Sequence, residues 1–135
     1  MKTVLFACVH NAGRSQMAAA LFNALADPAL ARAVSAGTQP GEHVHPIVVE
    51  AMNELGADLS GVRPRLLTDD LAREAALLVT MGCGEPCPAV PGLRREDWPL
   101  EDPKGRPIGE VRRIRDDVQE RVRRLVDSSG WARAI

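Results

Sequence analysis

The chain has 135 residues, of which 45% are hydrophobic and 26% charged. This length predicts a single domain over residues 1–135, large enough to bury a core without disulfides or metal ions. The formal net charge of −1 argues against a general nucleic-acid-binding protein, which normally carries an excess of basic residues. No apolar run approaches the roughly 18 residues that cross a bilayer, so we expect neither a nucleic-acid nor a membrane partner.

The cysteine count indicates the redox compartment. The sequence contains three cysteines and no tyrosine. An odd number of cysteines is unlike the disulfide framework of a small secreted protein, whereas reduced thiols are typical of the cytosol. We therefore expect a cytoplasmic protein whose cysteines are free for chemistry.

Strands and helices are expected to alternate along the chain. Residues 3–8 are apolar and partly β-branched, which predicts a buried strand of a parallel sheet. The last predicted helix repeats apolar residues at three- and four-residue spacing, which gives it one buried face. Such alternation predicts an α/β domain with helices on both faces of a parallel sheet. The predicted strands are 3–8, 31–36, 76–81 and 94–98, and the predicted helices are 16–26, 45–55, 67–74 and 108–126.

Some polar side chains are expected to act locally on these helices. Ser15 and Thr68 are good N-cap residues for the helices that follow them. Charged residues on the last helix stand four apart, a spacing at which opposite charges pair on a solvated face. The expected pairs are Arg112–Asp116, Asp117–Arg121 and Glu120–Arg124.

The loop after the first strand carries the clearest chemical signal. Between Cys8 and the next helix, a turn containing Asn11 and Gly13 would point its backbone N–H groups into one concavity at the helix N-terminus. Arg14 can add a two-pronged contact to a bound oxyanion. The same groups and the Ser15 hydroxyl would favour the Cys8 thiolate, which makes Cys8 a candidate nucleophile. The expected anion-binding residues are Val9, His10, Asn11, Ala12, Gly13, Arg14 and Ser15.

A simpler interpretation is that Cys8 is a small buried hydrophobic residue and Arg14 a surface charge. The spacing of Cys8, Arg14 and Ser15 at a strand–helix junction favours the nucleophile. His10 has two open roles: it either adjusts the electrostatics of the loop or faces solvent.

The segment Cys8 to Ser15 resembles the CX5R[ST] loop shared by low-molecular-weight protein tyrosine phosphatases and the arsenate reductases built on the same fold. The resemblance extends over nearly the whole chain, including Ser35-Ala36-Gly37-Thr38 and Asp102-Pro103. It implies a four-stranded parallel sheet with helices on both faces. It also implies that Ser35 supports Asn11 in the loop.

A general acid is expected in the loop that contains Asp102 and Pro103. Displacing an oxygen from arsenate or phosphate requires a proton on the leaving group, which a nearby carboxylic acid can supply. Pro103 restricts the backbone of Asp102 to an extended conformation. The resemblance implies that Asp102 is the acid, and Glu101 is a competing carboxylate that the sequence does not separate from it.

Cys83 and Cys87 distinguish a reductase from a phosphatase. A phosphatase needs one cysteine, whereas a reductase can draw two electrons from a thiol pair that ends as a disulfide. The resemblance implies that Cys83 attacks Cys8 to release arsenite and that Cys87 then forms a disulfide for thioredoxin to reduce. Their four-residue spacing is shorter than in the best-known arsenate reductases. The alternatives are inert thiols or a zinc site with His43 and His45, which does not have a standard zinc spacing.

These observations favour a thioredoxin-coupled arsenate reductase, with arsenate as substrate and phosphate or sulfate as analogues. One alternative is reduction by a low-molecular-weight thiol such as mycothiol, which would bypass Cys87. Another is a phosphatase, although Lys104 and Gly105 stand where phosphatases of this fold carry ring-binding aromatic residues. We expect no cofactor and no metal. In particular, Asn11 and Ser35 match a potassium site of some family members, but Ala19 and Arg65 fall on its carboxylate positions.

Overall fold

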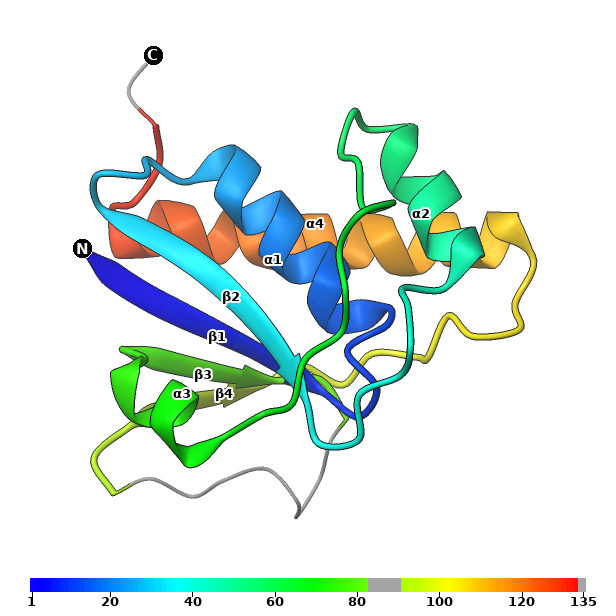
Figure 1. Ribbon diagram of the computed structural model, residues 1–135. Coiled ribbons are helices and arrows are strands. Elements are labelled where there is room, and N and C mark those ends of the chain that lie inside the picture. The colour runs from blue at the N-terminus through cyan, green and yellow to red at the C-terminus, as the bar shows by residue number, and fades with distance from the viewer. Residues whose placement is uncertain (83–90, 134–135) are drawn as a thin grey trace.

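The computed structural model describes residues 1–82 and 91–133 (Figure 1). The predicted elements all form, with bounds shifted by a few residues. The strands are β1 (Lys2–Cys8), β2 (Ala31–Gly37), β3 (Leu77–Thr80) and β4 (Arg94–Asp97), and the helices are α1 (Arg14–Leu25), α2 (Pro46–Asn53), α3 (Asp69–Glu74) and α4 (Ile108–Ser129).

The strands form a four-stranded sheet in the order β2-β1-β3-β4, and each pair of neighbours is parallel. The predicted fold is therefore confirmed. In the β1–β2 register, Cys8 lies beside Gly37. Because parallel strands all end at one edge, the loops that follow β1 and β2 meet there, as Figure 1 shows. In open α/β sheets this carboxyl edge is where ligands bind.

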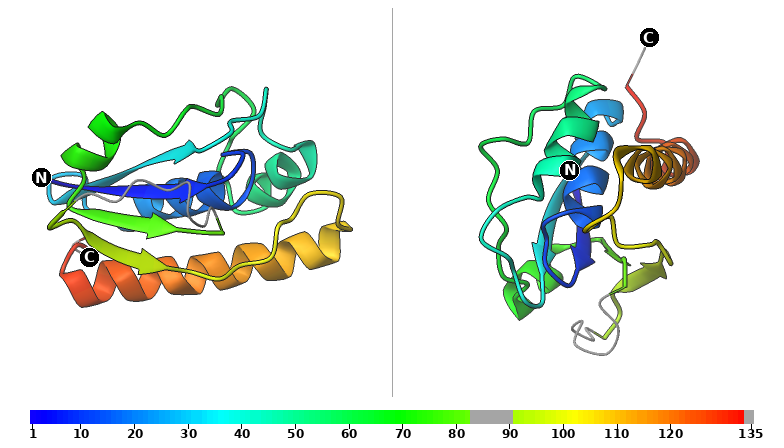
Figure 2. Two further views of the ribbon diagram at one scale, coloured as in Figure 1. Left: turned by 90° about the horizontal axis from the view of Figure 1, so that it is seen from below. Right: turned by 90° about the vertical axis from the view of Figure 1, so that its right-hand side faces the viewer.

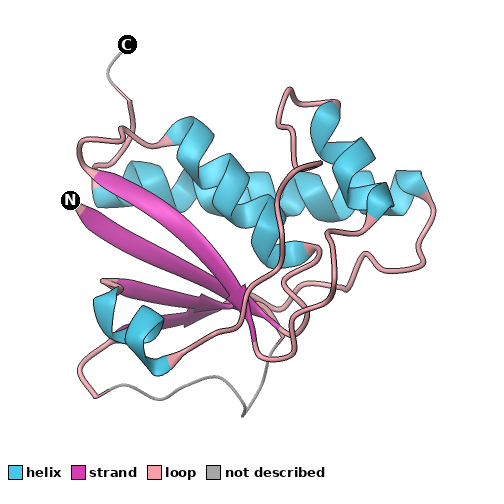
Figure 3. Cartoon of the chain, in the orientation of Figure 1, coloured by secondary structure: helices cyan, strands magenta, loops and turns pink. Residues whose placement is uncertain are grey.

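Both faces of the sheet are covered, but unequally. Side chains alternate along β1, so that Val4, Phe6 and Cys8 join the larger core with α1, α2 and α4. Leu5 and Ala7 join a smaller core beside α3. Figure 2 shows α3 on the side of the sheet opposite to α4, and Figure 3 shows the helices gathered mainly on one face. The side chain of Cys8 thus points toward the face that α1 covers.

The ends of the helices differ in part from the prediction. Thr68 is the N-cap of α3, and its side chain accepts a hydrogen bond from the Leu71 N–H at 3.2 Å, as expected. Ser15 is not an N-cap: α1 begins at Arg14, its N-cap is Gly13, and no side chain caps it. The Ser15 hydroxyl is used instead within the loop before the helix. Helix α4 continues to Ser129, where Gly130 adopts a φ of 75°.

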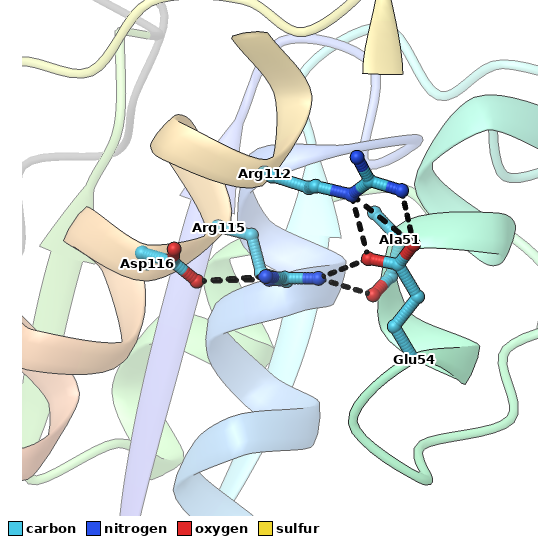
Figure 4. A network of polar contacts seen from close by, with 5 residues as sticks. All are labelled: Ala51, Glu54, Arg112, Arg115 and Asp116. Carbon is cyan, nitrogen blue, oxygen red and sulfur yellow. Dashed lines mark hydrogen bonds and ion pairs between the residues drawn. The ribbon is translucent and has the colours of Figure 1, made fainter. Parts of the chain in front are cut away.

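A cluster of charges joins α2 to α4 (Figure 4). The carboxylate of Glu54 accepts from Arg112 at 2.7 Å and from Arg115 at 2.7 Å. The predicted pairing of Arg112 with Asp116 is therefore wrong, because the partner of Arg112 comes from a different helix. The predicted pairs Asp117–Arg121 and Glu120–Arg124 form, at 3.1 and 3.2 Å.

Within residues 1–82 and 91–133, none of the helices has the length and apolar character to cross a membrane.

Candidate active site

Cys8 is the last residue of β1 and is only 2% exposed. The chain then turns through residues 9–13 and enters α1 at Arg14. Asn11 takes the left-handed conformation within this turn, with a φ of 50°. Asparagine tolerates that conformation better than most residues. Gly13, the other residue expected to allow it, instead has a φ of −146°.

The backbone carbonyls of the loop are held from outside. The Thr38, Gln39 and Gly41 N–H groups donate to the Cys8, Val9 and His10 carbonyls at 3.2, 2.8 and 2.9 Å. His45 donates its N–H to the Ala12 carbonyl at 2.9 Å, and Met17 donates to Gly13 at 3.0 Å. Within the described part of the chain, no backbone N–H of residues 9–15 donates a hydrogen bond. The loop therefore presents donors where an oxyanion needs them.

The glycine at the end of β2 permits this close contact. A Cβ atom on Gly37 would lie 2.6 Å from the Val9 carbonyl oxygen and 2.9 Å from the Asn11 nitrogen. A larger residue at this position would push the loop away from the sheet edge. The segment after β2 can therefore hold the loop carbonyls only because position 37 has no side chain.

The nucleophile and its neighbours form a chain of hydrogen bonds. Ser15 Oγ lies 2.8 Å from Cys8 Sγ, and Asn11 Nδ2 donates to Ser15 Oγ at 2.7 Å. A thiolate has no hydrogen, so the Ser15 hydroxyl must donate to it. The geometry suits a sulfur nucleophile that is stabilised in its charged form.

Arg14 is held at the mouth of the loop. Its Nη1 donates to the Leu100 carbonyl at 3.2 Å, and its side chain is 11% exposed. Gly82, with a φ of 92°, lies so close that a Cβ there would be 2.6 Å from Arg14 Nη1. Gly82 is not among the site residues expected from the sequence, although a glycine after β3 and before Cys83 offered a signal.

The two candidate acids lie in different surroundings. The carboxylate of Asp102 is 3.9 Å from Arg14 Nη2, and its other oxygen accepts from the Lys104 N–H at 3.0 Å. Glu101 instead pairs with Arg106 at 3.3 Å and is 65% exposed. A Cβ on Gly13 would lie 2.8 Å from Pro103 Cγ, so the Asp102–Pro103 segment packs directly on the loop. The structure thus brings Asp102, and not Glu101, to Arg14.

Ser35 does not make the contact expected for it. Among the described residues, its side chain forms no hydrogen bond with Asn11. Asn11 Oδ1 instead accepts from the Arg65 N–H at 3.0 Å and from Gln16 Nε2 at 3.0 Å. The Ser35 carbonyl accepts from Arg65 Nε at 3.1 Å. Among the described residues, Gln16 and the Arg65 N–H hold Asn11 Oδ1, and the Ser35 side chain does not.

The histidines lie together beside the loop. A hollow of about 230 Å³ is lined by His10, Ala12, Gly41, Glu42, His43, His45 and Lys104. Burial lowers the pKa of His45 from its ordinary value, and nearby positive charges add to this effect while Asp102 opposes it. His10 Nδ1 donates to the Gln39 carbonyl at 3.0 Å, because a carbonyl only accepts. His10 therefore belongs to the wall of the site.

Two predicted site residues, Cys83 and Cys87, lie outside the described residues. In the ranges that are described, no three His, Cys, Asp or Glu side chains are placed to hold a metal ion. The zinc alternative needs both cysteines, and it therefore also involves residues outside the described ranges.

The arrangement can attack a tetrahedral oxyanion. Backbone N–H groups and Arg14 would hold three of its oxygens, Cys8 would approach the central atom, and a carboxylic acid at Asp102 would protonate the departing oxygen.

Known proteins that are similar to this chain belong to a phosphatase family and include arsenate reductases. Residues 3–132 match the family model described as low molecular weight phosphotyrosine protein phosphatase. A Halobacterium salinarum protein is 40% identical over 128 residues, which are 90% of this chain and 89% of that protein. The arsenate reductase of Staphylococcus aureus is 35% identical over 123 residues, 87% of this chain and 91% of that protein. A solved thioredoxin-dependent arsenate reductase of Corynebacterium glutamicum is 41% identical, with a TM-score of 0.81 over 95% of this chain. The match spans 61% of that longer chain.

Proposed function

The chain belongs to the low molecular weight phosphotyrosine protein phosphatase family, and we propose that it is an enzyme that reduces arsenate to arsenite with Cys8 as nucleophile. The observation that carries the proposal is the loop itself. Its carbonyls are bound from outside, and Ser15 Oγ lies 2.8 Å from Cys8 Sγ. This geometry suits attack on an oxyanion, and the similarity to arsenate reductases favours arsenate as that oxyanion.

The first step of the proposed reaction forms a sulfur–arsenic bond. The Cys8 thiolate attacks the arsenic atom of arsenate, whose oxygens are held by the loop N–H groups and by Arg14. The departing oxygen is the hydroxyl of hydrogen arsenate, and it takes a second proton from Asp102, so that it leaves as water. The product is an adduct in which arsenic is still in its higher oxidation state.

The second step reduces the arsenic. The Cys83 thiolate attacks Cys8 Sγ, the sulfur–arsenic bond breaks, and its electron pair stays on arsenic, which is released as arsenite. The new Cys8–Cys83 disulfide is then attacked by Cys87, which frees Cys8 and leaves a Cys83–Cys87 disulfide. A dithiol of thioredoxin supplies the two electrons that restore both thiols. The contact of Gly82, the residue before Cys83, with Arg14 supports this assignment.

This relay requires reduced thiols at rest, which favours a cytoplasmic location. The thioredoxin route is further supported by the similarity to a thioredoxin-dependent enzyme. A low-molecular-weight thiol such as mycothiol remains the competing reductant, because it could attack Cys8 without Cys87.

A phosphatase activity on aromatic substrates is disfavoured by where the aromatic rings lie. Phe6 packs edge-on to Phe22 and at 5.5 Å from the ring of Trp98, and Trp131 packs on Phe22. These are all four aromatic residues of the chain. The hollow beside the loop is lined instead by three histidines, Glu42 and Lys104, together with Ala12 and Gly41, and none of the four aromatic rings lines it.

Arsenite formation tests the proposal. With thioredoxin, its reductase and a nicotinamide reductant, we expect the parent chain to turn over arsenate many times. Cys83→Ser should form the Cys8 adduct but release no arsenite, and Cys87→Ser should stop as a Cys8–Cys83 disulfide that mass spectrometry detects.

Two results would count against the relay. Parental turnover by Cys83→Ser with thioredoxin would show that Cys83 takes no part. Parental turnover by Cys87→Ser with mycothiol, together with no turnover of the parent with thioredoxin, would favour the low-molecular-weight thiol route.

A further inference from the structure

Gln16 is a polar side chain in the first turn of α1 that is buried beneath the loop, with 4% exposure. Its Nε2 donates to the Asn11 carbonyl at 3.1 Å and to Asn11 Oδ1 at 3.0 Å. A backbone carbonyl can only accept, so the nitrogen end of the Gln16 amide must face Asn11. Burial of an amide is costly unless its hydrogen bonds are formed. The two bonds to Asn11 offset this cost, so Gln16 does more than fill space.

The contact fixes the orientation of the Asn11 amide. The Arg65 backbone N–H also donates to Asn11 Oδ1, at 3.0 Å, and an N–H can only donate. With two donors at Oδ1, the Nδ2 group must face Ser15, to which it donates at 2.7 Å. The orientation of the Asn11 amide thus follows from which of its neighbours can only donate or only accept a hydrogen bond, and not from how its oxygen and nitrogen atoms are labelled.

The orientation of Asn11 decides where the Ser15 hydrogen goes. With Nδ2 toward Ser15, the hydroxyl oxygen accepts from Asn11 and its hydrogen is free to donate to the Cys8 thiolate, 2.8 Å away. With the amide reversed, Oδ1 would accept that hydrogen and draw it away from the sulfur. Charge-assisted hydrogen bonds are the stronger ones, so the orientation matters most when Cys8 is charged.

We propose that Gln16 is a positioning residue for the nucleophile: it holds Asn11 Oδ1 away from Ser15, so that the Ser15 hydroxyl donates to Cys8. The inference rests on the role of Cys8 in the proposed function, but not on arsenate being the substrate. Among the described residues, the Gln16 side chain forms hydrogen bonds with Asn11 alone, so it acts on Cys8 through Asn11 and Ser15.

Alkylation of Cys8 by iodoacetamide as a function of pH tests this without arsenate. In a Cys83→Ser, Cys87→Ser background, Cys8 is the sole thiol of the chain. Replacing Gln16 by Met keeps the length of the side chain and removes the donor. We expect the rate at neutral pH to fall about 5-fold, the ratio that one net hydrogen bond contributes, and the pH of half-maximal rate to rise.

A second substitution distinguishes positioning from packing. In a Ser15→Ala background the hydroxyl is absent, so Gln16→Met should cause no further change in the alkylation profile. Gln119→Met on α4 is the matched control and should leave the profile unchanged. An unchanged profile for Gln16→Met, or an equal further loss in the Ser15→Ala background, would overturn the inference.

A measurement on the unsubstituted residue covers the case in which Gln16→Met does not fold. In the background with Cys8 as sole thiol, the side-chain amide signals of Gln16 and Asn11 in nuclear magnetic resonance should shift with the same pH midpoint as Cys8 alkylation. Ser15→Ala should abolish that shift. Amide signals that do not change when Cys8 is ionised would refute the role of Gln16. Failure to reduce arsenate would refute only the proposed function and would not affect the role of Gln16.

Discussion

Two neighbouring carboxylates near the loop, Glu101 and Asp102, show how strongly a side chain's role depends on its partners. Asp102 accepts from the Lys104 N–H and lies 3.9 Å from Arg14. Glu101 turns to Arg106 and is 65% exposed. The packing of Pro103 against Gly13 fixes this difference, since a Cβ on Gly13 would lie 2.8 Å from Pro103 Cγ. Although Glu101 and Asp102 are adjacent in the sequence, the Asp102 carboxylate lies at the site and the Glu101 carboxylate faces solvent.

We predict that Asp102→Asn lowers the turnover of arsenate by about 100-fold, the lower range for loss of a general acid. The amide cannot donate a proton to the departing oxygen as an acid does. Glu101→Gln is the matched control and should leave turnover within about 2-fold, because its carboxylate faces Arg106. Steady-state arsenite formation measures both. Equal losses in the two variants would contradict the assignment of the acid.

At the scale of the elements, α2 is joined to α4 through Glu54. Two arginines from α4 donate to its carboxylate, and these bonds lower the pKa of Glu54 from 4.5 to about 2. Helix α2 follows directly on His45, whose N–H holds the Ala12 carbonyl of the loop at 2.9 Å. The ion cluster is therefore connected to the site through the N-terminus of α2.

The lowered pKa of Glu54 sets the direction of its pH dependence. A carboxylate whose pKa is lower in the folded chain stabilises the fold above its unfolded value, and this contribution is lost as the pH falls toward the folded value. We predict that Glu54→Gln lowers the urea midpoint at neutral pH, and that the difference shrinks below the ordinary value of 4.5 and disappears near 2.

Urea unfolding at fixed ionic strength checks this, with Glu120→Gln as control. Glu120 pairs with Arg123 and Arg124, which are 53% and 77% exposed, so its substitution should change the midpoint little. A difference between Glu54→Gln and the parent that stays constant from neutral to acid pH would show that the ion pairs do not cause it.

On the scale of the whole molecule, the site is assembled from segments far apart in the sequence. The loop after β1 is held by residues 38–41 after β2, by His45 before α2, and by the Arg65 N–H from the segment before α3. Leu100 and Asp102, from the segment before α4, contact Arg14. An anion that binds here binds the folded chain and not the unfolded one.

Sulfate should therefore raise the melting temperature, and this gain should depend on Arg14. Ligand at 100 times its Kd stabilises a fold by about 2.7 kcal/mol. We predict that millimolar sulfate stabilises the parent but has little effect on Arg14→Ala, because the two-pronged contact is lost. Arg73→Ala is the control, since Arg73 is 64% exposed and pairs with Asp70 on α3. Equal stabilisation of all three chains would reflect only the general effect of sulfate on burial.

The sequence by itself determined the α/β class, the order of the elements and the loop that carries Cys8 and Arg14. These features follow from local rules: apolar periodicity, the backbone freedom of Asn11 and the spacing of Cys8 and Arg14 within one strand–loop–helix unit. The four strands were also predicted from the apolar segments, whereas the role expected for Asp102 came from the resemblance. The relay of Cys83 and Cys87 stays a prediction.

Only the tertiary structure decided which distant groups meet. Ser15 was expected both to cap a helix and to favour the Cys8 thiolate, and the fold shows only its contact with Cys8. Arg112 was paired with its own helix, but the fold offers Glu54 from α2. Gln16 reads as one more residue of an alanine-rich helix until its amide is found on Asn11, whose orientation the distant Arg65 N–H also sets. Periodicity describes which face of an element is buried, whereas hydrogen-bond partners depend on how the elements pack, and that is why these contacts had to be seen in three dimensions.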